Sequence, residues 1–87
     1  MEIKKEMIHR QLAGDNILVP GGSAVLDLNG LFVMTETGAF IWSVLPHAET
    51  EDEIVDKMLE EYDVDRETAQ EDVKEFLGRL REYGIID

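Results

Sequence analysis

The sequence predicts an α+β domain of the winged-helix kind, in which a small N-terminal antiparallel β-meander is followed by three α-helices. Short apolar runs separated by turn residues fill the first 35 residues, which is typical of strands. Apolar residues at helical spacing, with clear cap residues, fill the remainder. Because the chain has 87 residues, 44% of them apolar, we expect one domain (1–87) around one small core.

The first two strands are expected at 7–14 and 17–20, where the runs MIHRQLAG and ILVP stand close together. Between them lie Gly14, Asp15 and Asn16, which are common turn residues. This spacing predicts a hairpin with a three-residue turn.

A second hairpin is expected where AVLDL (24–28) and LFVMT (31–35) flank Asn29 and Gly30. An Asn-Gly pair favours a tight hairpin because both turn positions need positive φ. Segment 31–35 would then pair with 24–28 along one side. Nothing in the sequence supplies a partner for its other side, so we expect a free strand edge there.

A first helix follows, capped by Thr35 or Thr37 and ended by Pro46. Apolar residues on nearly every side of it predict burial between the sheet and the other helices. Trp42, the only tryptophan of the chain, is expected to anchor the core. Gly38 is expected to let the start of this helix approach the sheet closely.

The second helix starts at Thr50, which has capping-box spacing to Glu53, and the third starts at Asp65. Each carries one apolar stripe. The stripes are Ile54, Val55, Met58, Leu59 and Tyr62 in the second helix, and Ala69, Val73, Phe76, Leu80 and Tyr83 in the third. Gly84 favours a left-handed stop, after which the chain end is expected to return to the core.

The charge is acidic and uneven. The formal net charge is −12, and residues 49–87 hold 15 acidic against 5 basic residues. Such a chain repels phosphate backbones and anionic lipids, which disfavours binding to nucleic acid or membrane. The absence of cysteine excludes disulfides and fits a reducing compartment, and no apolar run has the length of a membrane span. We therefore expect a cytoplasmic location.

Residues with catalytic or metal-binding spacing are missing. His9 and His47 stand alone, without a spaced ligand partner. The acids of segment 63–75 resemble a calcium loop, but Thr68 occupies the place of the required glycine and Lys74 that of the closing acid. We expect no enzyme activity, no metal and no cofactor.

From the last strand onward, the order and spacing of four motifs resemble the PqqD-like proteins. The motifs are GAFIW at 38–42, T-x-x-E-I-V at 50–55, YDVD at 62–65, and D-V-x-x-F-L-x-x-L at 72–80, the last followed by the glycine and isoleucines of 84–86. The resemblance implies a non-catalytic winged-helix domain that binds the leader segment of a ribosomally made precursor peptide. It also implies that the leader adds as a strand to the sheet edge and lies against the third helix. The bound precursor would be presented to a modifying enzyme, often a radical S-adenosylmethionine protein.

We predict that the leader contacts the edge strand and one flank of the third helix. The expected residues are Leu31, Phe32, Val33 and Met34 on the strand, and Lys74, Leu77 and Arg81 on the helix.

Helical geometry selects that flank. We measure the angle of each residue around the helix axis from Ala69, at about 100° per residue. Leu77 then lies at about 80°, and the two predicted bases, Lys74 and Arg81, lie at larger angles on the same side. This flank would offer an apolar pocket and positive charge to leader carboxylates. The opposite flank holds Asp72, Glu75 and Glu82, with Arg79. The alternative is that the bases are dispersed on a solvated helix and Leu77 only widens the core stripe.

Two other functions stay open at this point. The chain could be a general protein-interaction or transcription-regulating winged helix that binds no leader, although its charge disfavours DNA. The free edge of 31–35 could also pair with a second copy and form a homodimer.

Overall fold

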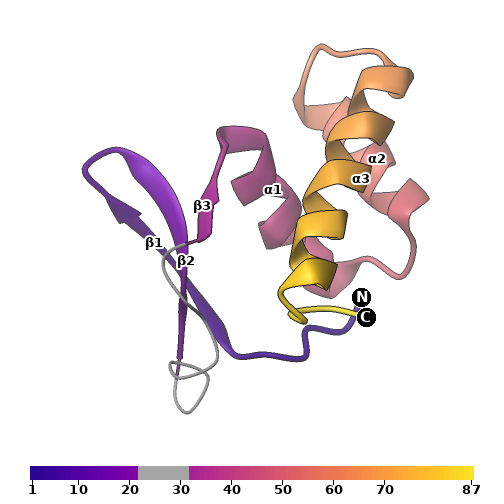
Figure 1. The fold of residues 1–87 in the computed structure, drawn as a ribbon. Coiled ribbons are helices and arrows are strands. Elements are labelled where there is room, and N and C mark those ends of the chain that lie inside the picture. Colours follow the sequence, from indigo (N-terminus) through magenta and orange to yellow (C-terminus); the bar gives the residue numbers. More distant parts are fainter. Residues whose placement is uncertain (22–31) are drawn as a thin grey trace.

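A computed structural model describes residues 1–21 and 32–87 of the chain. Its elements are β1 (Met7–Leu12), β2 (Asp15–Pro20), β3 (Phe32–Met34), α1 (Glu36–Val44), the 3₁₀ helix η2 (Leu45–His47), α2 (Glu51–Glu61) and α3 (Arg66–Glu82). The strands form one antiparallel sheet in the order β1-β2-β3. Figure 1 shows the sheet on one side, α2 and α3 on the other, and α1 between them. The predicted α+β architecture of a small sheet followed by three helices is confirmed.

The β1–β2 hairpin turns over two residues. Leu12 pairs with Asp15, so the turn consists of Ala13 and Gly14, whose φ angles are 53° and 86°. Two positive φ values identify a type I′ turn. The predicted three-residue turn is wrong, because Asp15 and Asn16 already belong to β2. Sequence reasoning missed this turn because alanine rarely adopts positive φ.

Strand β3 pairs with β2, placing Phe32 opposite Leu18 and Met34 opposite Asn16. The sheet therefore continues directly from the first hairpin to the strand that precedes α1. The expected hairpin at Asn29-Gly30, with its strand 24–28, lies outside the described residues.

The core fills the space between one face of the sheet and the three helices. Its fully or nearly fully buried side chains are Leu18, Phe32 and Met34 from the sheet, Ile41 and Leu45 from α1 and η2, Ile54, Val55 and Met58 from α2, Ala69, Val73, Phe76, Leu77 and Leu80 from α3, with Ala48, Ile85 and Ile86. The apolar stripes expected in the second and third helices are thus largely confirmed as core.

Helix α1 centres on Ile41, not on Trp42. The side chain of Ile41 is 1% exposed, whereas Trp42 is partly buried and packs at the border of the core. The expectation of a Trp42 anchor is therefore corrected. The face that α1 turns inward carries Gly38, Ile41 and Leu45, which share one side at helical spacing, and Trp42 lies on its flank.

Each α-helix begins at a side-chain cap that the sequence predicts. The cap oxygen accepts a hydrogen bond from the backbone N–H three residues further on: Gly38 to Thr35 at 3.1 Å, Glu53 to Thr50 at 3.3 Å and Thr68 to Asp65 at 2.7 Å. These bonds satisfy N–H groups that the helices themselves leave unpaired. Thr35, rather than Thr37, is the cap of α1.

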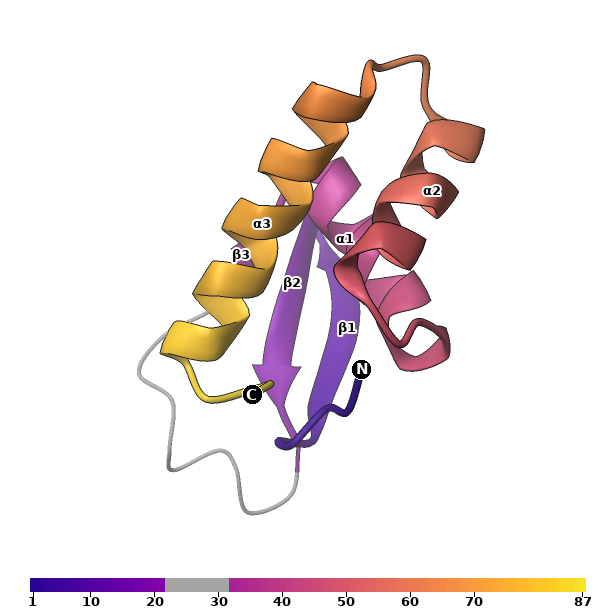
Figure 2. The same cartoon turned by 90° about the vertical axis from the view of Figure 1, so that its right-hand side faces the viewer.

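Helix α3 ends in a Schellman motif at Gly84, whose φ is 70°. The N–H of Gly84 donates to the carbonyl of Arg81 at 3.0 Å, and that of Ile85 donates to Leu80 at 2.9 Å. This reversal brings Ile85 and Ile86 back onto the core, as expected. Figures 1 and 2 show both chain ends at the end of the molecule where α3 stops. In the described part of the chain, no helix is long and apolar enough to cross a membrane.

We expect Leu77→Ala to lower the free energy of unfolding by about 2–5 kcal/mol, the range for removing a fully buried leucine. Leu77 is 0% exposed. Urea denaturation followed by circular dichroism measures the change. The exposed neighbour Lys74, changed to Ala, is the control and should stay within about 0.5 kcal/mol of the parent. Equal curves for Leu77→Ala and the parent would mean that this side of α3 is not packed.

The cap of α3 should make stability depend on pH. Hydrogen bonds from the backbone N–H and the hydroxyl of Thr68 hold the pKa of Asp65 below its usual value. The folded state thus favours the carboxylate, and the resulting stability is present above about pH 4 and lost as pH falls through the lowered pKa. Asp65→Asn keeps a capping oxygen that does not titrate. The difference in melting temperature between the parent and this variant should therefore shrink from pH 7 to pH 3, and a constant difference would contradict the assignment.

Candidate functional site

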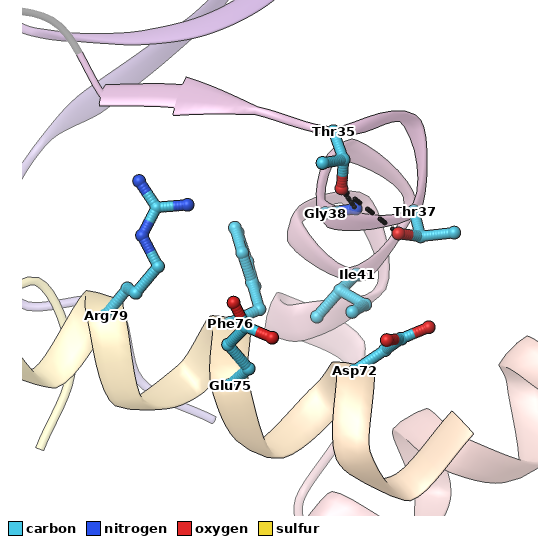
Figure 3. Close-up of a pocket in the computed structure, with 8 residues that line it drawn as sticks. All are labelled: Thr35, Thr37, Gly38, Ile41, Asp72, Glu75, Phe76 and Arg79. Carbon is cyan, nitrogen blue, oxygen red and sulfur yellow. Dashed lines mark hydrogen bonds between the residues drawn. The ribbon is translucent and has the colours of Figure 1, made fainter. Parts of the chain in front are cut away.

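A cavity of about 150 Å³ lies between the start of α1 and α3, directly after the end of β3 in the chain. One of its lining residues, Arg79, also contacts Phe32 of β3. Eight residues line this cavity: Thr35, Thr37, Gly38 and Ile41 from the start of α1, and Asp72, Glu75, Phe76 and Arg79 from α3. Figure 3 shows Phe76 and Arg79 rising from α3 toward β3, with Asp72 beneath the first turn of α1. We call this feature the β3–α3 groove.

Aromatic contacts set the width of the groove. The ring of Phe32, on β3, meets the ring of Phe76 edge-on at a centroid distance of 6.0 Å, and that of Tyr83 at 5.2 Å. The guanidinium carbon of Arg79 lies 4.5 Å from the centre of the Phe32 ring, a cation–π contact. Because Phe32 and Phe76 are 3% and 6% exposed, this cluster joins the core to the groove wall.

Gly38 forms the floor of the groove. A Cβ atom at this position would lie 3.2 Å from two ring atoms of Phe76, closer than side chains normally pack. The close approach that Gly38 permits is therefore to α3. The expected close approach to the sheet is thereby corrected.

At the outer edge of β3, the edge that does not face β2, the N–H and C=O groups of Val33 point outward. In the β1–β2 hairpin, the tight turn makes Leu12 and Asp15 a hydrogen-bonded pair, and such pairs alternate along antiparallel strands. Counted outward from the turn, Glu6 and Gly21 should again form a hydrogen-bonded pair. They do, since the Gly21 N–H donates to the Glu6 carbonyl at 2.9 Å.

The same alternation fixes the other side of β2. Residues Asp15, Ile17 and Val19 turn their backbone groups toward β1, so Asn16 and Leu18 turn theirs toward β3. Their partners Met34 and Phe32 then face β2. Val33, which lies between them, points its N–H and C=O away from β2, toward the outer edge. Within residues 1–21 and 32–87, no strand pairs with that edge.

The predicted strand residues divide between the core and the surface. The side chains of Phe32 and Met34 point into the core and are 3% and 4% exposed, while Val33 is 49% exposed on the other face of the sheet. Phe32 still reaches the groove through its contact with Arg79. Leu31 lies outside the described residues.

The predicted helix residues do not face the groove. Leu77 is completely buried, so it forms no surface pocket. Arg81 reaches the start of α2, where its guanidinium lies 3.5 Å from a carboxylate oxygen of Glu51, and it also donates to the Asp87 carbonyl at 2.8 Å. Lys74 is exposed and shares the helical flank of Arg81. The flank of α3 in the groove is the opposite one, which the sequence analysis had set aside as acidic.

A signal for the flank that lines the cavity was present in the sequence. With Ala69 at zero and about 100° per residue, the apolar arc of α3 extends from Tyr83 at about −40° to Leu77 at about 80°. Leu77, which is fully buried, therefore widens the core face of the helix on that side. Asp72 at about −60° and Arg79 at about −80° lie just beyond the other border, next to the aromatic residues.

The charged groups of the groove are not neutralised within the described structure. Asp72, Glu75 and Arg79 make no ion pair or side-chain hydrogen bond with another described residue. Elsewhere on α3, Arg66 pairs with Asp56 at 2.9 Å and Arg81 pairs with Glu51. Arg79 is instead stacked on Phe32, and Figure 3 shows its guanidinium turned toward β3.

A second cavity, of about 330 Å³, lies between η2 and α2. Val44, His47, Ala48, Glu53, Asp56, Lys57 and Glu60 line it. None of its lining residues belongs to a described strand, so these residues offer a ligand no strand pairing. The β3–α3 groove, which combines an edge, an aromatic wall and unpaired charges, is the stronger candidate site.

Two solved structures resemble the chain over nearly its whole length. One is TbiB1 in complex with the TbiA(beta) leader peptide, with 26% sequence identity and a TM-score of 0.73, covering 100% of this chain and 95% of that one. The other is lasso peptide synthetase B1 complexed with the leader peptide, with 21% identity and a TM-score of 0.71, covering 97% and 93%. At that identity the second likeness supports the fold alone.

Among curated proteins, no sequence matches the chain. A family model does match: that of coenzyme PQQ synthesis protein D (PqqD), over residues 22–86. The match spans three quarters of the sequence and includes β3 and all the helices that form the groove. The chain therefore belongs to the PqqD family.

Proposed function

We propose that the chain captures the leader segment of a precursor peptide, by adding it as a strand to the outer edge of β3 and holding it against α3. The observation that carries this proposal is the position of the Val33 N–H and C=O, which face outward directly beside the β3–α3 groove. Strand addition supplies pairing that any sequence can use, and neighbouring side-chain pockets supply specificity. The relatives that were solved with leader peptides support this role for the fold.

The peptide would meet two different surfaces. Its backbone would pair with Val33, and alternate side chains would point into the groove, toward Phe76, Arg79 and the cavity floored by Gly38. The residues proposed for peptide contact are thus Val33, Thr35, Gly38, Asp72, Glu75, Phe76 and Arg79, with Phe32 as the aromatic support. Lys74, Leu77 and Arg81 leave the proposed contact set because they lie on the far flank or in the core.

Chemistry on the precursor would come from a separate modifying enzyme, such as a radical S-adenosylmethionine protein. Among the described residues, those that line the groove include no histidine, cysteine or lysine, which are common nucleophiles and proton carriers near neutral pH. The chain would act by holding the leader while the core segment of the precursor reaches the enzyme. A homodimer through the same edge would compete with the leader, since the Val33 backbone serves one strand at a time.

Val33→Pro should weaken leader binding about threefold to tenfold, because it removes the outward N–H, worth about 0.5–1.5 kcal/mol, and places a ring against the added strand. The fold should persist, since that N–H makes no bond to β2 and the side chain is half-exposed. The probes are labelled synthetic peptides that cover the N-terminal halves of small open reading frames beside the gene, titrated by fluorescence anisotropy.

Val33→Ala is the matched control, because it shortens the side chain but keeps the N–H, and it should bind like the parent. Melting curves of both variants establish that they are folded. If a peptide binds the parent and both variants with equal affinity, it does not add to the β3 edge, and capture by strand addition is refuted.

A further inference from the structure

The charges of the β3–α3 groove are ordered along its length. Arg79 lies at the end where Phe32 begins β3, because it stacks on that ring. Asp72 lies at the other end, beneath the residues that begin α1, and Glu75 lies between Asp72 and Arg79, as Figure 3 shows. The groove thus has a positive end and a negative end.

This order is not a by-product of internal ion pairing. Glu75 and Arg79 are four residues apart on α3, a spacing that allows a salt bridge within a helix, yet they form none. Stacking on Phe32 directs the guanidinium of Arg79 toward β3 instead. Both signs of charge therefore remain available to a ligand in the groove, within the described part of the chain.

The spacing of these charges fits an extended peptide. Along α3, at 1.5 Å per residue, Glu75 stands about 6 Å and Asp72 about 10 Å before Arg79. Side chains on one face of a strand recur every second residue, about 6.7 Å apart. Two groove-facing side chains at positions i and i+2 of a bound strand would then lie opposite the acidic pair and opposite Arg79.

We infer that the groove selects leader strands by charge order: a basic side chain opposite Asp72 and Glu75, and an acidic side chain two positions later, opposite Arg79. This inference rests on the proposed capture of a leader at the β3 edge. The order follows from an added strand that runs antiparallel to β3, the better-aligned pairing, so that its N-terminal part lies at the Thr35 end. A strand with the two charges exchanged would place like charges together at both ends of the groove.

Charge order gives the chain a way to discriminate peptides that bind the edge equally well. Backbone hydrogen bonds do not depend on the side chains of the peptide, and the aromatic wall would accept many apolar side chains. Like charges facing each other across an interface disfavour the wrong partner, which complementary contacts alone do not achieve. The acidic surroundings of the groove would also attract the basic side chain, since residues 49–87 hold 15 acids against 5 bases.

The test is a selection from a phage-displayed library of random twelve-residue peptides on the purified chain. Peptides enriched on the parent should carry a basic residue two positions before an acidic one. The triple variant Asp72→Lys, Glu75→Lys and Arg79→Glu should enrich the reverse order. Lys74→Glu, a charge reversal on the far flank of the same helix, is the matched control and should select the parental order.

Synthetic copies of one enriched peptide then measure how much charge order changes the binding affinity. Exchanging its two charged residues should weaken binding to the parent about tenfold, since two attractions become two repulsions of surface-pair size. The triple variant should reverse that preference, which a merely structural effect of the substitutions would not do. Raised salt should reduce the difference between the two peptides.

The outcomes separate the two proposals. If enriched peptides lose affinity for Val33→Pro but show no charge order, capture at the edge stands and the charge reading is overturned. If enriched peptides show the charge order but bind Val33→Pro as tightly as the parent, the groove selects by charge without strand addition. The proposed antiparallel strand at the β3 edge is then refuted. If the parent enriches no peptide, both the capture and the charge reading are overturned.

Discussion

The edge-on contact between Phe32 and Phe76 determines how the rest of the site is arranged. Phe32 belongs to the edge strand and Phe76 to α3, so their packing at 6.0 Å sets the distance between the strand edge and the helix beside it. Gly38 favours this arrangement, because a Cβ atom there would lie 3.2 Å from two atoms of the Phe76 ring and would require a small shift of that ring. Arg79 and Tyr83 complete the cluster from the next turns of α3. The groove is therefore an outward extension of the core, built on the same rings.

The shortness of β3 has consequences for recognition. Only Val33, among the described residues, turns its backbone groups to the outer edge, and a net hydrogen bond is worth about 1 kcal/mol. Micromolar affinity requires about 8 kcal/mol after the entropic cost of binding. Backbone pairing alone falls far below that value, so side chains in the groove must provide most of the affinity. In the proposed capture, side chains of the α3 flank would therefore contribute more of the affinity than the strand edge itself.

The two flanks of α3 have different electrostatic roles. On the far flank, Arg81 is joined to Glu51, and near the start of the helix Arg66 is joined to Asp56, so those bases connect α3 to α2. Exposed pairs of this kind add little stability, but they keep positive charge away from the groove side. On the groove flank Arg79 remains, held by an aromatic ring and not by an acid. Of the two bases that helical spacing predicted for binding, Arg81 is thus already paired with an acid, whereas Lys74 makes no ion pair within the described residues.

The sequence by itself determined the secondary structure, the caps and most of the core. Thr35, Thr50 and Asp65 start the helices, and the apolar stripes point inward, because these are local effects of hydrogen bonding and helical spacing. Only the tertiary structure decided which flank of α3 meets β3 and which backbone groups of β3 remain outside. Those features depend on contacts between residues far apart in the chain, such as Phe32 with Phe76, and on a register set by the unexpected turn at Ala13 and Gly14. A helical wheel orders the residues around an axis, but the packing partner on each side is fixed only when the sheet and the helices close around a common core.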